Sequence, residues 1–101
     1  MLRIPVRRDG KAGPIRTAAS GLPVIDDFAF TGHGDSLLAA LNRPNQVALV
    51  KPDGTHTIVL TGDDGLQSPT SIAVRGCTFL VANAAYNTLT DPNLLRAKLA
   101  R

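Results

Sequence analysis

Residues 47–60 read Val-Ala-Leu-Val-Lys-Pro-Asp-Gly-Thr-His-Thr-Ile-Val-Leu, which places two short apolar runs on either side of a turn. Pro52 suits the second position of a tight turn, and Gly54 suits a backbone conformation with positive φ. Short apolar runs separated by turn residues are typical of β-hairpins. The stretch therefore predicts two antiparallel strands joined by the turn 51–56.

A second hairpin is predicted immediately before the first. The apolar runs 28–30 and 37–41 flank Thr31-Gly32-His33-Gly34-Asp35-Ser36, a segment rich in glycine. Glycine-rich segments between apolar runs mark turns. Four short strands are therefore expected within one stretch of about 40–50 residues, which is the usual length of a four-stranded propeller blade.

The same pattern occurs more than once along the chain. Asp9-Gly10 and Asp53-Gly54 lie 44 residues apart, and Gly21-Leu22 and Gly65-Leu66 have the same spacing. Further matches at this spacing are Thr17 with Thr61, Ala29 with Ala73, and Gly32 with Gly76. Beyond Gly32 the spacing falls to 42, so that Leu38 matches Leu80. A repeat of this length with short strands predicts propeller blades rather than helical repeats.

We therefore expect an all-β chain of about two four-stranded antiparallel blades of a β-propeller, incomplete as a ring. Residues 1–20 are expected to form the outer strands of a preceding blade, residues 21–64 one full blade, and residues 65–101 most of a following and last blade. In the first segment, Leu2 to Val6 would pair with Ile15 to Thr17, and Pro5 fits an edge strand.

Three strands are expected in the last segment, at Ser71 to Val74, Phe79 to Asn83 and Leu95 to Leu99. A short amphipathic helix over Asn93 to Arg101, beginning after Asp91-Pro92, is the alternative for the final stretch. The apolar and basic residues alternate from Leu95 to Leu99, which favours the strand.

The composition excludes several classes of protein. Hydrophobic residues make up 44% and charged residues 19%, which is typical of globular domains. The formal charge is +3, but the basic residues are spread along the chain, which does not favour nucleic-acid binding. No apolar run is long enough for a membrane span, and the first eight residues lack the apolar centre of a signal peptide, so the localisation stays open. The single Cys77 excludes an internal disulfide and is expected to be a small core residue.

Several segments resemble the gluconolactonase, senescence-marker-protein and luciferin-regenerating-enzyme-like family of six-bladed propellers. Residues 21–30, Gly-Leu-Pro-Val-Ile-Asp-Asp-Phe-Ala-Phe, are similar to the Pro-Asp-Gly-apolar-Ala-apolar strand of that family. Residues 37–42 and 47–54 are similar to its Leu-Trp-Val-Ala strand and to its apolar strand before an Asp-Gly turn. Pro69 to Val74 and Leu80 to Asn83 look like a last blade, in which Thr70 replaces the metal-ligating Asp. The resemblance covers most of the chain, as a C-terminal fragment of such a propeller.

The resemblance implies a divalent metal, Ca²⁺, Mg²⁺ or Mn²⁺, in the full-length parent, because sugar-lactonase members hydrolyse lactones with one such ion. Asp26 matches a metal-ligating Asp at the mouth of the central channel, and Asn42 lies near a position that faces the channel. Asp27 stands where the family has Gly. The other family ligands, a Glu and an Asn from other blades, have no counterpart here, so no cofactor is expected for this chain alone.

The candidate residues also have structural interpretations. Asp26 could accept hydrogen bonds from backbone N–H groups at the start of a strand. Asp63-Asp64 is expected to be a solvated turn rather than a paired-carboxylate site, and His33 and His56 are expected on the surface because no other metal-binding residue lies at ligand spacing.

The resemblance implies a fragment of a sugar-lactonase-like propeller whose parent is a metal-dependent lactone hydrolase acting on a lactone or sugar-like ligand, and we expect the isolated chain to be inactive. The alternative is a non-catalytic propeller that serves as a binding scaffold, since a fold does not fix a function. In either case the uncovered blade faces predict self-association, with Ile4, Val6 and Ile15 among the exposed side chains.

Overall fold

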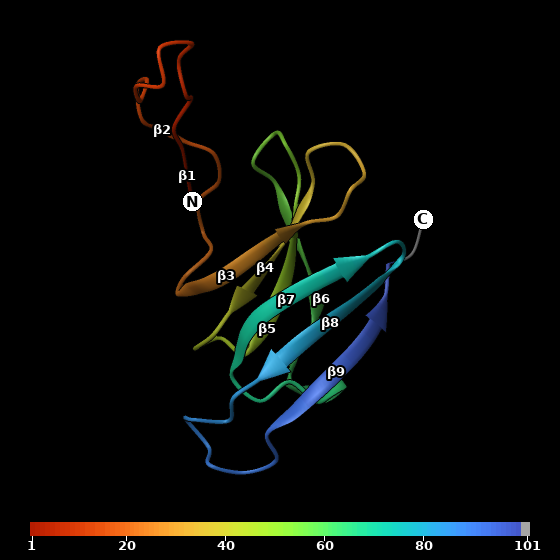
Figure 1. Cartoon of the computed structure of the whole chain (residues 1–101). Helices are drawn as coiled ribbons and strands as arrows, with labels where there is room; N and C mark the ends of the chain where they lie inside the picture. The colour runs from red at the N-terminus through yellow and green to blue at the C-terminus, as the bar shows by residue number, and fades with distance from the viewer. Residues whose placement is uncertain (100–101) are drawn as a thin grey trace.

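The computed structural model describes residues 1–99, and these residues form an all-β fold (Figure 1), as the sequence predicts. The strands pair only in the antiparallel sense, in sheets of two, four and three strands. Their bounds are β1 Leu2–Arg3, β2 Arg16–Thr17, β3 Ile25–Phe30, β4 Leu37–Leu41, β5 Gln46–Val50, β6 His56–Leu60, β7 Pro69–Arg75, β8 Thr78–Asn83 and β9 Asn93–Lys98. A 3₁₀ turn, η1, spans Gly62–Asp64.

The four-stranded sheet contains both predicted hairpins in the order β3-β4-β5-β6. Strand β4 is buried along its whole length, because its residues alternate between the two covered faces of the sheet. The sheet accounts for residues 25–60, within the segment 21–64 that the repeat assigns to one full blade.

The three-stranded sheet has the order β7-β8-β9. Strand β9 covers Asn93–Lys98 and pairs with β8 from Thr78↔Lys98 to Asn83↔Asn93. The strand predicted near Leu95 to Leu99 is therefore confirmed, and the alternative of a helix over this segment is wrong for residues 93–99. Pairing with β8 overrides the local helix signal because it satisfies the backbone groups of the segment.

The N-terminal strands β1 and β2 pair with each other through Leu2↔Thr17 and Arg3↔Arg16, as predicted. The expected strand from Leu2 to Val6 is interrupted after Arg3 and resumes only as the single bridge Val6↔Ala12. Pro5 explains the gap, because it has no N–H to donate. Ile4, Val6 and Ile15 are 48%, 77% and 64% exposed, so the prediction that they lie on the surface is confirmed.

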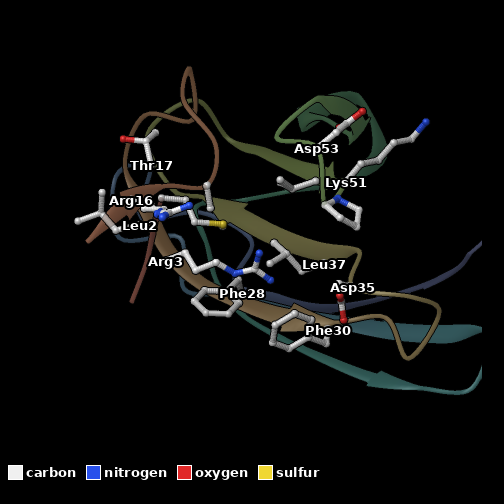
Figure 2. A pocket seen from close by; sticks show the side chains of 14 residues that line it. Leu2, Arg3, Arg16, Thr17, Phe28, Phe30, Asp35, Leu37, Lys51 and Asp53 are labelled. Carbon is white, nitrogen blue, oxygen red and sulfur yellow. The ribbon is translucent and has the colours of Figure 1, made fainter. Parts of the chain in front are cut away.

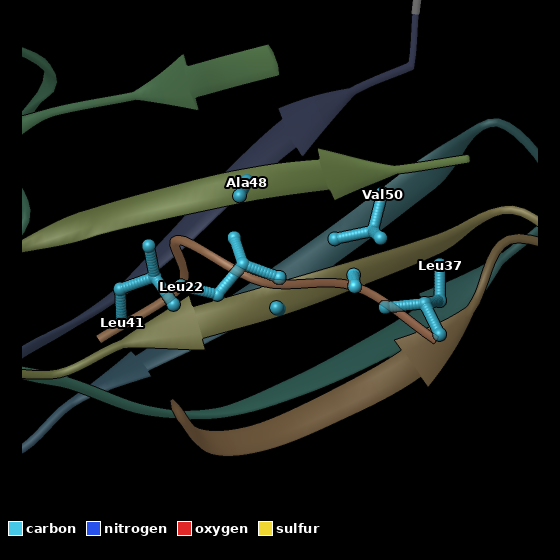
Figure 3. Packing of buried hydrophobic residues seen from close by; sticks show 7 residues of the cluster. Leu22, Leu37, Leu41, Ala48 and Val50 are labelled. Atoms are coloured by element: carbon cyan, nitrogen blue, oxygen red, sulfur yellow. The ribbon is translucent and has the colours of Figure 1, made fainter. Parts of the chain in front are cut away.

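The two larger sheets pack face to face, with β3 lying beside β7 (Figure 1). Their shared core is lined by apolar residues from both sheets and from the connection before β7, namely Leu38, Ala40, Val47, Leu66, Ile72, Phe79 and Val81. The opposite face of the four-stranded sheet is covered by Ala19 and Leu22, which form one hydrophobic cluster with Leu37, Leu41 and Val50. Figure 3 shows Leu22 among the side chains of this cluster. Leu22 and Leu66 lie 44 residues apart and each covers a sheet face, so the connecting segments follow the repeat as well.

The backbone follows the 44-residue spacing closely. Left-handed conformations occur in pairs at this spacing. In the part of the repeat that ends at Gly32, one such pair is not glycine: Val24 has φ 55° and Ser68 has φ 57°. A β-branched residue with positive φ is strained, so the conformation at Val24 is imposed by its surroundings. The paired glycines are Gly10 with Gly54, Gly21 with Gly65, and Gly32 with Gly76.

Candidate functional site

The repeat places a β-bulge on the first strand of each large sheet. In the four-stranded sheet the register shifts between Ile25 and Asp27, which makes Asp26 the extra residue. In the three-stranded sheet it shifts between Pro69 and Ser71, which makes Thr70 the extra residue. Bulges redirect side chains and are frequent beside functional sites. The bulges therefore mark Asp26 and Thr70 as equivalent positions of the two sheets.

Both bulges lie on edge strands that face each other. Strand β3 is an edge strand of the four-stranded sheet, and β7 is an edge strand of the three-stranded sheet. Between them, Oδ2 of Asp27 accepts a hydrogen bond of 3.1 Å from the N–H of Ile72. Asp27 therefore joins the two sheets. Asp26, one residue earlier, is exposed, whereas the hydroxyl of Thr70 donates to the carbonyl of Ala82 at 3.3 Å.

Asn42 is buried at the junction of the two sheets, with 1% of its surface exposed. Its Nδ2 donates to the carbonyl of Pro69 at 3.1 Å, and its Oδ1 accepts a hydrogen bond from the hydroxyl of Tyr86. Both ends of the amide are therefore engaged within the protein. These contacts tie the end of β4 to the start of β7, which is a structural role.

The residues of this chain do not by themselves fit a divalent cation. Ca²⁺ takes six to eight oxygen ligands and Mg²⁺ takes six, mostly carboxylates, carbonyls and waters. Asp26 offers one exposed carboxylate, while the side-chain oxygen of Asn42 already accepts a hydrogen bond. Within residues 1–99 no group of three His, Cys, Asp or Glu side chains is close enough to hold a metal ion. Asp26 would need ligands from outside residues 1–99 to form such a site.

Other residues considered from the sequence lie in turns. His33 and His56 are exposed. Asp63 and Asp64 are exposed in η1, where the Asp64 carboxylate accepts from the Thr61 N–H at 2.9 Å, so they form a solvated turn, as predicted.

The expectation that Cys77 is a core residue is wrong. It is exposed, in the turn that joins β7 to β8. The reason is that Gly76, with φ 59°, reverses the chain there, so the apolar run is divided by a tight turn.

Sequence reasoning missed a set of asparagine hydrogen bonds around the connection from η1 to β7. Asn45 donates to the carbonyl of Leu66 and accepts from the N–H of Ser68, both at 2.9 Å. Asn83 accepts from the N–H of Gln67 at 2.9 Å, and Asn93 donates to the carbonyl of Gly65 at 3.1 Å. These side chains satisfy a connecting segment that lies between the sheets and is partly removed from water. The only signal in the sequence is the presence of Asn at strand ends, which favours local backbone bonding.

A groove of about 360 Å³ lies between the N-terminal hairpin and the four-stranded sheet (Figure 2). Phe28 and Phe30 line one side, with ring centroids 6.1 Å apart and planes at 87°. Arg3 and Arg16 from β1 and β2 line the other side. Phe28 is 48% exposed and Phe30 59%, so the groove contains the largest aromatic surface that the described chain presents to solvent.

No model of a protein family matches the chain, and no curated protein matches its sequence. Among residues 1–99 no helix has the length and apolar character that a membrane crossing needs.

Proposed function

We propose that this chain supplies two blades of a sugar-lactonase-like β-propeller and has no hydrolase activity alone. The observation that supports this proposal is the pair of equivalent bulges at Asp26 and Thr70 on facing edge strands. A ring of such sheets would bring successive bulges to one central opening, where residues from several blades could form a shared site. This chain would contribute Asp26 to that site.

In the intact parent the proposed reaction is hydrolysis of a lactone or sugar-like ester. A divalent cation, when bound, supplies a Lewis acid that polarises the lactone carbonyl. Asp26 would orient toward the opening because the bulge turns its side chain away from the packed sheet faces. Asp27 holds the edge of β3 against β7 and thereby fixes the position of its neighbour.

The alternative function is a non-catalytic propeller that binds a partner. The exposed Phe28 and Phe30 beside Arg3 and Arg16 favour this alternative, since aromatic and arginine side chains are common in binding surfaces. The two functions differ in whether the other blades of the parent carry a Glu and an Asn at the metal positions. Both leave open the outer face of the three-stranded sheet and, on the outer face of the four-stranded sheet, the surface around Phe28 and Phe30. We propose that these surfaces self-associate.

Lactone hydrolysis by the isolated chain tests the proposal. The wild-type chain is assayed with Ca²⁺, Mg²⁺ and Mn²⁺ beside the variants Asp26→Ala and Asp35→Ala, the latter removing an exposed carboxylate from the turn between β3 and β4. We expect no turnover above background from any of them, because one carboxylate cannot hold the ion. Metal-dependent turnover that is lost in Asp26→Ala but kept in Asp35→Ala would contradict the proposal.

A further inference from the structure

The interface between the two large sheets is built from cross-strand rows. The four-stranded sheet contributes the rows Asp27–Ala40–Val47 and Ala29–Leu38–Leu49. The three-stranded sheet contributes the rows Ile72–Val81–Leu95 and Val74–Phe79–Ala97. Together these rows bury the larger hydrophobic core of the chain.

Each sheet also has an outer face whose rows match one half of that interface. We name the outer face of the four-stranded sheet the head face, and its rows are Phe28–Ala39–Ala48 and Phe30–Leu37–Val50. We name the outer face of the three-stranded sheet the tail face, and its rows are Ser71–Ala82–Leu94 and Ala73–Leu80–Arg96.

The repeat relates these outer faces to the buried ones. Phe28 and Phe30 lie 44 residues before Ile72 and Val74, so the head face corresponds to the buried face of the three-stranded sheet. Ser71 and Ala73 lie 44 residues after Asp27 and Ala29, so the tail face corresponds to the buried face of the four-stranded sheet. The outer faces of the two sheets therefore correspond to the two complementary halves of the internal interface. On the head face Phe28 and Phe30 are exposed, while the rest of its rows is buried beneath Ala19 and Leu22.

Both outer faces present apolar surface. On the tail face Leu80 is 36% and Leu94 65% exposed, and a hollow of about 640 Å³ lies over Ala73, Leu80 and Arg96. On the head face Phe28 and Phe30 border the groove of about 360 Å³, while Ala19 and Leu22 cover the remainder. The head face thus presents the rings of Phe28 and Phe30, and the tail face presents a shallow hollow.

We propose that the tail face of one copy docks on the head face of a second copy, in the arrangement that the two sheets have within one chain. This inference rests on the proposed function, since it names the partner of the open blade faces. Phe30 of the second copy takes the place of Val74 and fills the hollow over Ala73 of the first. The small side chain of Ala73 leaves room for the larger ring.

One polar contact also has an equivalent across the proposed interface. Within the chain, Asp27 accepts a hydrogen bond from the N–H of Ile72. The equivalent pair between copies is the hydroxyl of Ser71, which is exposed, and the N–H of Phe28. The hydroxyl can accept this hydrogen bond as the carboxylate does, so the edge strand β3 would be joined to β7 of the neighbouring copy.

The N-terminal hairpin lies beside the head face, on the far side of the groove (Figure 2). Within residues 1–99, β1 and β2 pair only with each other, and the hairpin projects from the two stacked sheets (Figure 1). It corresponds by repeat to the third and fourth strands of a blade, so the first two strands β7 and β8 of the incoming copy would lie in the groove. Since β9 is already the third strand of the incoming sheet, the hairpin would have to shift outward by one strand and lie outside β9.

Charge does not drive the docking, because positively charged side chains outnumber negatively charged ones on both faces. The three-stranded sheet carries Arg75, Arg96 and Lys98 at one end. The groove on the head face is lined by Arg3, Arg16 and Lys51 together with Asp35 and Asp53. Since salt screens repulsion between exposed charges, we expect association to tighten as ionic strength rises.

The two faces differ from each other, so the contact is heterologous and can continue from copy to copy into a ring or an open chain. This property gives a sharp test by sedimentation velocity over a range of concentrations. Leu80→Glu places a charge on the tail face and Phe30→Glu places one on the head face. We expect each variant alone to associate at least about a hundredfold more weakly than the wild type, because the docked carboxylate would be unpaired.

Mixing the two variants should restore association, but only as 1:1 dimers, since one intact tail face meets one intact head face. A misfolded variant could not give this result. Leu89→Glu is the matched control: Leu89 is 83% exposed and lies outside both faces, so this variant should associate like the wild type. Circular dichroism checks that all three variants keep the β-sheet spectrum.

Three outcomes would overturn the inference. A wild-type chain that stays monomeric at all concentrations has no docking face. A Leu80→Glu variant that still self-associates would indicate head-to-head pairing, and a Phe30→Glu variant that still does so would indicate tail-to-tail pairing. None of these results bears on lactone turnover, so failure of the docking and failure of the proposed function remain distinguishable.

Discussion

The hairpins 2–17 and 46–61 have the same turn but different surroundings. In each, the residue that opens the turn and the glycine three residues later make matching main-chain hydrogen bonds, of 2.8 and 2.9 Å. In each, an Asp carboxylate accepts from the N–H two residues further on. Yet Val6 is 77% exposed, and its equivalent Val50 is 3% exposed.

The difference shows which part of a hairpin is specified locally. The turns form alike because Pro, Asp and Gly residues favour tight turns wherever they occur, and Asp-Gly is common to both hairpins. The burial of the second hairpin depends on β3 and β4, which pair beside β5 and supply the rest of its sheet. The first hairpin has no such strands beside it within residues 1–99, so its apolar side chains remain in solvent.

Substitution of the two equivalent turn glycines, Gly10 and Gly54, should give the largest difference between the two hairpins. Gly54 has φ 88°, and a Cβ there would lie 2.6 Å from the carbonyl oxygen of Ala18. Gly10 has φ 82°, and a Cβ there would meet nothing within 4 Å. We expect Gly54→Ala to lower the free energy of unfolding by about 3 kcal/mol, from left-handed strain plus the steric clash. Gly10→Ala should cost about 1 kcal/mol, from strain alone.

Urea denaturation followed by circular dichroism at low protein concentration measures both values. Equal losses for Gly10→Ala and Gly54→Ala would show that the second turn does not pack on the segment at Ala18. The chain segment 18–22, which covers the head face, would then be held in another way.

Substitution of the equivalent valines, Val6 and Val50, should give the second-largest difference in the free energy of unfolding. Val50→Ala removes two methyl groups from the core beside Leu22 and Leu37, and we expect a loss of about 2 kcal/mol from reduced apolar burial and the cavity left behind. Val6→Ala changes an exposed side chain and should alter the free energy of unfolding by less than about 0.5 kcal/mol. The same denaturation measurement applies. A loss above 1 kcal/mol for Val6→Ala would mean that the first hairpin is covered in solution, as by another copy.

The fold was predictable because its signals are local and repeated. The turns at Gly32, Gly54 and Gly76 divide apolar runs, and the 44-residue spacing shows that one pattern occurs twice. The β9 segment was harder to predict, since its residues fit a short helix until β8 is present to pair with it. Cys77 was misassigned because it lies between the apolar runs 72–74 and 79–82, while the turn that separates them contains Gly76 in a left-handed conformation.

The candidate site was predictable only in part. The repeat aligned Asp26 with Thr70, and the equivalent bulges give both positions a common backbone geometry. The role of Asn42 could not be read from its neighbours, because its partners, Pro69 and Tyr86, lie 27 and 44 residues away. Asp27 likewise joins the sheets through a contact 45 residues away in sequence. Contacts of this kind depend on how two sheets pack, which local patterns do not encode.

The smallest expected effect concerns the acid in the second turn, where Thr55 stands at the position that Lys11 has in the first. The pKa of Asp53 lies below its usual value, chiefly because the Thr55 hydroxyl donates to its carboxylate at 2.6 Å, and further because the Thr55 N–H donates at 2.9 Å. Since the folded pKa is below the unfolded one, the stabilisation is present above the unfolded pKa and is lost as pH falls through the folded pKa.

Thr55→Ala should therefore raise the pKa of Asp53 toward its usual value, measured from the carboxyl ¹³C shift during acid titration. Thr57→Ala, at an exposed residue that does not contact the carboxylate, should leave this pKa unchanged. The effect on stability should be small, because the carboxylate is fully exposed to solvent. An Asp53 pKa that is the same in Thr55→Ala and the wild type would show that the hydroxyl does not hold the turn in solution, and the two hairpins would then differ only in what covers them.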